Sequence, residues 1–100
     1  MNENEVRNGR VNITEDYYVK IEDRNYTLCK KRISKGEKTA GQEMEDVIGY
    51  FDSFEGVFKR YFKEEVVSRS VGKDMELKEF MELVKGIKED IVAIRKELEI

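Results

Sequence analysis

The sequence contains no histidine and a single cysteine, Cys29. Without histidine, the chain lacks the commonest general base at neutral pH and the commonest metal ligand. One cysteine cannot form an internal disulfide, and structural zinc sites need several cysteine or histidine ligands. On a predicted strand with no histidine to activate it, Cys29 is expected to be a small buried residue rather than a nucleophile. These absences favour a protein that is not an enzyme and has no cofactor or metal site.

Proline and long apolar runs are absent as well. No stretch approaches the roughly 20 apolar residues of a membrane-spanning helix, and the first residues, "MNENEVRNGR", lack the apolar core of a secretion signal. The net charge of −3 argues against bulk attraction to nucleic acid or to an anionic membrane, although not against a local basic patch. We therefore expect a cytoplasmic protein that does not contact a membrane.

Alternating β-branched and aromatic residues predict a β-hairpin in the first half of the chain. Apolar residues lie at every second position at Val11 and Ile13 and again at Tyr17, Val19 and Ile21. The polar tetrad "EDRN" predicts a turn, and "YTLCKKRI" returns as the second strand. The glycine-containing segment 34–43 is expected to be a flexible loop. The apolar run "MEDVIGYF" after it is predicted to be a third strand.

From residue 52 onward, the apolar period lengthens from two to the spacing of a helix. Asp52 or Ser53 is a candidate N-cap, and Gly72 is placed to end or bend the helix. The apolar stripe between them is mostly aromatic and consists of Phe54, Val57, Phe58, Tyr61 and Phe62.

These elements predict an α+β fold, in which a three-stranded antiparallel sheet is packed by one helix and followed by a long C-terminal coiled-coil-like helix. The expected divisions are a flexible N-terminus at 1–10, a small domain at 11–72 and an oligomerisation helix at 73–100.

The C-terminal stretch has an apolar residue at every a and d position of three heptads. The predicted oligomer interface is this seam, made of Leu77, Phe80, Val84, Ile87, Ile91, Ile94 and Leu98. In a parallel pair, Asp90 would face Arg95 of the neighbouring chain, whereas an antiparallel pair would bring acidic positions together. Isoleucine at d positions favours a trimer, a tetramer or a helical bundle over a strict dimer.

The alternative is that this helix packs inside its own domain, because an ordinary amphipathic helix shows the same stripe. Its 22 residues span about 33 Å, which is longer than the roughly 25 Å of the first helix. We therefore expect the small domain to leave the last turns uncovered, with Ile91, Ile94 and Leu98 exposed in a monomer. Burial of these residues in a homo-oligomer is the preferred interpretation.

A basic patch in the β-hairpin is the second candidate site, either for nucleic acid or for a protein partner. Cationic and aromatic side chains on a sheet can bind single-stranded nucleic acid by phosphate neutralisation and base stacking. The alternative is a sheet edge protected by cations, with the tyrosines in the core. The candidate residues are Arg24, Lys30, Lys31, Arg32, Lys35, Tyr17, Tyr18 and Tyr26.

The run "VIGYFDSFEGVFKRYFKEE" at 47–65, together with "NYTL" at 25–28, resembles small accessory proteins of bacteriophages and prophages of Gram-positive bacteria. Those proteins are largely uncharacterised, so the resemblance implies a phage or mobile-element context but no catalytic or binding residues. From it we expect an oligomeric protein in the bacterial host that binds a host or phage protein, such as a defence or replication component. The alternative function is a small nucleic-acid-binding module that uses the basic hairpin.

Overall fold

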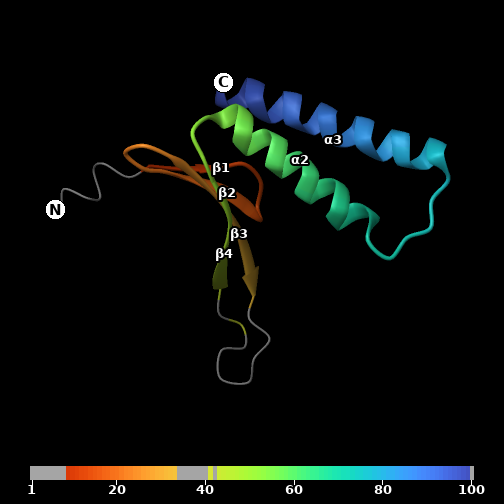
Figure 1. Cartoon of the computed structure of the whole chain (residues 1–100), viewed down its shortest axis with the longest axis horizontal. Coiled ribbons are helices and arrows are strands. Elements are labelled where there is room, and N and C mark those ends of the chain that lie inside the picture. The colour runs from red at the N-terminus through yellow and green to blue at the C-terminus, as the bar shows by residue number, and fades with distance from the viewer. Residues whose placement is uncertain (1–8, 34–40, 42, 100) are drawn as a thin grey trace. The chain divides into compact units, whose positions relative to one another are not determined.

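The computed structural model describes residues 9–33, 41 and 43–99, which contain strands and helices in the order ββββαα (Figure 1). The chain divides into two compact units after Ser53, with the strands in the first unit and the helices in the second. The elements are β1 (Gly9–Asn12), β2 (Tyr17–Ile21), β3 (Tyr26–Ile33), β4 (Glu43–Phe51), α2 (Phe54–Ser70) and α3 (Leu77–Leu98).

The strands form one antiparallel sheet in the order β1-β2-β3-β4. The α+β class and the antiparallel sheet are confirmed, but the sheet has four strands instead of the three predicted. The difference arises at Thr14, where the chain reverses. The Thr14 hydroxyl accepts hydrogen bonds from the backbone N–H groups of Asp16 (3.2 Å) and Tyr17 (3.1 Å), so the segment predicted as one strand becomes two.

Two predicted flexible segments lie largely outside the described residues. Residues 1–8 are not described, whereas Gly9 and Arg10 belong to β1 instead of the predicted terminal segment 1–10. The predicted loop at 34–43 includes the undescribed residues 34–40 and 42, and its last residue begins β4.

The centre of the sheet is buried on both faces. On one face Val19 pairs with Leu28, and both side chains are fully buried. On the other face Tyr18 pairs with Cys29, and both are again buried. A β-bulge interrupts the pairing of β3 with β4, because Leu28 lies opposite Gly49 while Cys29 lies opposite Val47.

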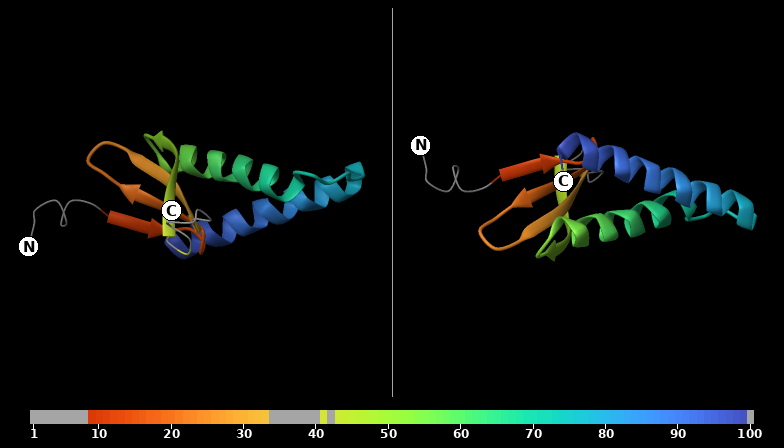
Figure 2. Two further views of the ribbon diagram at one scale, coloured as in Figure 1. Left: turned by 90° about the horizontal axis from the view of Figure 1, so that it is seen from below. Right: turned by 90° about the horizontal axis from the view of Figure 1, so that it is seen from above.

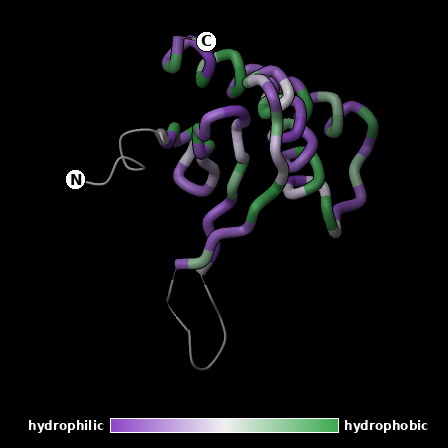
Figure 3. The backbone as a smooth tube through the Cα atoms, turned by 60° about the vertical axis from the view of Figure 1, so that its left-hand side comes forward, coloured by the Kyte–Doolittle hydropathy of each residue, from purple (hydrophilic) through white to green (hydrophobic). Residues whose placement is uncertain are grey.

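The helical unit is a hairpin in which α2 and α3 run antiparallel and side by side (Figure 2). Hydrophobic and hydrophilic stretches are mixed along the backbone of the helical unit (Figure 3). The connection after α2 contains Gly72 at φ 76°, a left-handed conformation that glycine adopts without strain, and this ends the helix as predicted. The buried side chains of the pair are Val57, Phe58, Tyr61 and Ile87.

The grouping of the elements differs from the predicted division at 72. The two helices α2 and α3 contact each other and belong to the same unit. Each contributes buried apolar side chains to this unit. Among the described residues, neither helix is long and apolar enough to cross a membrane.

Candidate functional site

The predicted oligomer seam on α3 is buried unevenly. Ile87 has no exposed surface, whereas Leu77 at the start of the helix is 73 % exposed. The remaining seam residues are half-buried, and they are Phe80, Val84, Ile91, Ile94 and Leu98. The last turns are therefore more covered than expected, and the most exposed seam residue lies at the opposite end of the helix.

The charges beside the seam pair within the hairpin. Asp90 accepts a hydrogen bond from the Arg69 guanidinium of α2 (3.4 Å). Arg95 pairs with Glu55 of α2, and its guanidinium lies 5.4 Å from the centre of the Phe58 ring. The two charges predicted to meet across a parallel dimer are thus both engaged by α2 of the same chain.

Two hollows follow one side of α3. One, of about 430 Å³, lies between the helices and is lined by apolar residues such as Phe62 and Val92. The other, of about 420 Å³, runs along α3 past Leu77 and Met81. Both are lined by Lys88, so they adjoin. We call the two together the α3 groove.

The floor of the α3 groove is apolar, yet large apolar side chains along it remain open to water. Phe58 is buried, and Phe62, Val84 and Ile91 are half-buried. Further along the same side of α3, Met81 is 62 % exposed and Val92 is 53 % exposed. The groove is therefore a hydrophobic surface with room for another apolar group.

Positive charge borders the α3 groove. Lys59, Lys85 and Lys88 line it and are exposed, and no carboxylate of the described residues forms an ion pair with any of the three. The one acidic residue that lines either hollow is Glu55, which Arg95 already neutralises. A ligand in the groove would meet apolar contacts flanked by unneutralised ammonium groups.

The tyrosines of the predicted basic patch are not available for base stacking. Tyr17 and Tyr18 are only 4 % and 3 % exposed, and as neighbours on one strand they point to opposite faces of the sheet. Lys30 lies 5.4 Å from the ring centre of Tyr17, and Arg10 lies 3.8 Å from that of Tyr18. Tyr26 is half-buried.

The cations of that patch are dispersed. Lys31 lies 5.8 Å from the Tyr18 ring, on the face opposite to Lys30. Arg32 pairs with Asp46 (2.7 Å), and Arg24 is exposed in the turn between β2 and β3. Lys35 lies outside the described residues. The described members of this patch are not brought together into one surface.

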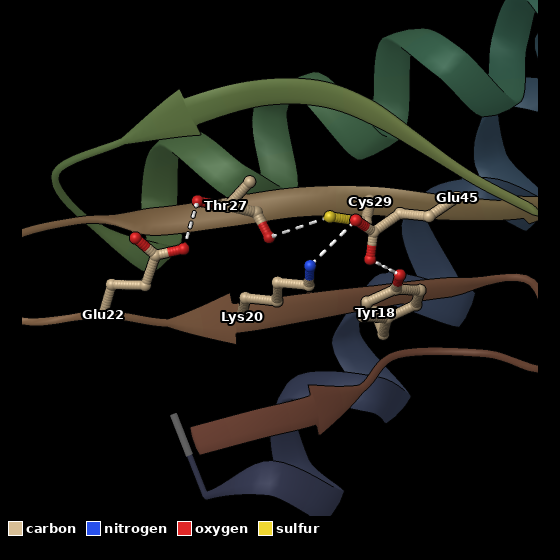
Figure 4. A network of polar contacts seen from close by, with 6 residues as sticks. All are labelled: Tyr18, Lys20, Glu22, Thr27, Cys29 and Glu45. Carbon is tan, nitrogen blue, oxygen red and sulfur yellow. Dashed lines mark hydrogen bonds and ion pairs between the residues drawn. The ribbon is translucent and has the colours of Figure 1, made fainter. Parts of the chain in front are cut away.

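A polar network on the sheet was not anticipated from the sequence (Figure 4). The Tyr18 hydroxyl donates a hydrogen bond to one carboxylate oxygen of Glu45, and Lys20 Nζ donates to the other at 2.8 Å. The hydrogen bonds from Lys20 and Tyr18 lower the pKa of Glu45 below its usual value. Burial, followed by the bond to Glu45, raises the pKa of Tyr18. The network joins β2 to β4 and is best explained as a structural cross-link.

Cys29 lies beside this network and is fully buried. Its Sγ lies 3.8 Å from the carbonyl oxygen of Thr27, to which it donates a weak hydrogen bond. Burial raises the pKa of the thiol, which disfavours the nucleophilic thiolate. Within the described ranges, no group of three or more cysteine or acidic side chains is placed to hold a metal ion.

Comparison with known proteins yields no relative. No protein-family model matches the chain, and neither the curated proteins nor the solved structures contain a match. The resemblance to phage accessory proteins stays a prediction.

Proposed function

We propose that this protein is a non-enzymatic interaction protein that binds another protein in the α3 groove. The observation that supports the proposal most strongly is the row of exposed apolar side chains along the groove, Leu77, Met81 and Val92. Single exposed apolar residues are common on soluble proteins, but a contiguous apolar hollow marks an interaction site.

The shape of the groove favours a helical partner. It extends along α3 from Leu77 to Arg95, a length of roughly 27 Å at 1.5 Å per residue. Two helices packed side by side present a furrow into which the ridge of a third helix fits. Amphipathic helices bind other proteins in this way, with apolar anchors spaced three or four residues apart. In this proposal the partner is a protein of the bacterial host or of the phage, as the resemblance implies.

A site-specific photocrosslinker tests the proposal. The photoreactive residue replaces Val92, which lines the groove, or its neighbour Ala93, which is exposed but does not line it. Irradiation of cells that make the protein should give a discrete protein adduct from position 92 and none from position 93. The same adducts from both positions, or none from either, would overturn the proposal.

A further inference from the structure

We infer that the α3 groove receives an acidic amphipathic helix, with its apolar face on the groove and its carboxylates on Lys59, Lys85 and Lys88. This inference rests on the proposed function and adds the chemistry of the partner. The juxtaposition that carries it is an exposed apolar hollow lined by three lysines that lack ion-pair partners among the described residues.

Among the described residues, the arginines of the helical unit form ion pairs, whereas its lysines do not. Arg60 pairs with Glu64 at 2.9 Å, and Arg69 pairs with Glu65 at 3.2 Å. Arg95 pairs with Glu55 across the two helices. The helical unit therefore pairs its three arginines with its own acids, whereas the lysines that line the groove remain available to a ligand.

The spacing of the lysines suits a helical ligand. Lys85 and Lys88 are three residues apart, which places them one helical turn apart on the same side of α3. Lys59 belongs to α2 and lines the hollow between the helices together with Lys88. A helix lying in the groove thus has cations on both sides, so acids on both flanks of its apolar face would be neutralised.

A second copy of the chain is a poorer occupant. In a two-fold contact centred on the groove, Lys88, which belongs to both hollows, would lie near Lys88 of the other copy. Like charges brought together at an interface oppose association. In addition, Asp90 and Arg95, the charges predicted to hold a parallel pair together, are already paired with α2.

Three synthetic peptides of about 18 residues test the inference, a length that matches the groove. All carry the same leucine face, and their flanking positions are glutamate, glutamine or lysine. Binding to the full-length protein is followed by fluorescence anisotropy. We expect the glutamate peptide to bind best and the lysine peptide worst, and we expect added salt to weaken only the glutamate peptide.

A charge-swap variant with a matched control locates the contact. Lys88→Glu should weaken binding of the glutamate peptide roughly tenfold, because an attraction between opposite charges becomes a repulsion. The same change should strengthen binding of the lysine peptide, because a repulsion becomes an attraction. Lys73→Glu makes the same change of charge at an exposed site in the connection between the helices and should change neither affinity. Circular dichroism confirms that both variants keep their helices.

Each other outcome has a defined meaning. If the three peptides bind equally, the groove binds helices without selecting charge, so this inference fails while the proposed function stands. If no peptide binds, both fail. If no peptide binds but the protein binds anionic vesicles, and Lys88→Glu abolishes that binding, the ligand of the groove is a membrane surface and not a protein. If the protein self-associates, and Lys88→Glu disrupts the association while the glutamate peptide does not, the occupant of the groove is a second copy of the chain.

Discussion

Asp90 on α3 accepts a hydrogen bond from Arg69 on α2 of the same chain, with 3.4 Å between the carboxylate oxygen and the guanidinium nitrogen. The heptad pattern had predicted that Asp90 would face Arg95 of a neighbouring chain. Arg95 instead pairs with Glu55, near the other end of α2. The first helix thus contacts, within one chain, both charges that the sequence pattern had paired across two copies, while the oligomer interface itself stays a prediction.

Substitutions at Ile87 and Leu77 distinguish packing of α3 against α2 from packing of α3 in a coiled coil. Both belong to the predicted seam, but Ile87 is fully buried and Leu77 is 73 % exposed. Ile87→Ala should lower the free energy of unfolding by about 2 to 5 kcal/mol, the usual cost of emptying a buried aliphatic site. Leu77→Ala should change it by less than about 0.5 kcal/mol.

Urea unfolding of the two variants measures this difference. A coiled coil that uses the whole seam would give losses of similar size at both positions. Equal losses would therefore contradict the packing described here.

The Glu45 network gives stability a defined pH dependence. The pKa of Glu45 is lower in the folded protein than its ordinary value of 4.5, because Lys20 and Tyr18 bond to the carboxylate. Its contribution is therefore complete above pH 4.5 and is lost as the pH falls through the lower folded pKa. Since Glu45 and Lys20 are partly exposed, Glu45→Gln should cost about 1 kcal/mol or less at pH 7.

Unfolding at pH 7 and at a pH below the folded pKa tests this expectation. The loss of unfolding free energy caused by Glu45→Gln should shrink in acid. Glu89 is an exposed carboxylate on α3, and Glu89→Gln should have the stability of the wild type at both pH values. A deficit that persists or grows in acid would contradict the assigned network.

Cys29 should be inert in the folded protein. Because its side chain is fully buried and burial raises the pKa of the thiol, thiol reagents at neutral pH should react with it only after local or global opening. The measurement is the rate of reaction with a chromogenic disulfide reagent, with and without denaturant. Labelling of the folded protein at the rate of a free thiol would show that the site is accessible.

The alternative function, nucleic-acid binding, depends on the basic residues of the β2–β3 hairpin. With Tyr17 and Tyr18 buried and Arg32 paired with Asp46, we expect no shift of labelled single-stranded DNA or RNA at low salt. A salt-dependent shift that is lost when Lys30, Lys31 and Arg32 become glutamate would revive that function.

Local patterns predicted much of the secondary structure. The heptad stretch forms one helix from Leu77 to Leu98, and the change of apolar period at residue 52 precedes a helix that begins at Phe54. Gly72 marks the end of that helix because a left-handed residue closes it without strain. Each of these features depends on neighbours in the sequence, so the sequence alone was enough to find them.

Features that depend on residues far apart in the chain were missed. The reversal at Thr14 was also missed, although it is local: the Thr14 side chain bonds the backbone two and three residues ahead, and Glu15 interrupts the apolar alternation at that point. Glu45 reaches Tyr18 only because β4 pairs with β3 in a register interrupted by a bulge. The α3 groove likewise depends on which side of α3 faces α2, and an a/d stripe does not identify its partner.

Light scattering behind a sizing column tests the central claim most directly, namely that α2 replaces a second copy and leaves the α3 groove open. The account predicts the monomer mass of 11.8 kDa for the protein alone over a wide range of concentration. A multimer that Leu77→Asp and Met81→Asp together convert into a folded monomer would contradict it, because the groove would then be closed by another copy of the chain.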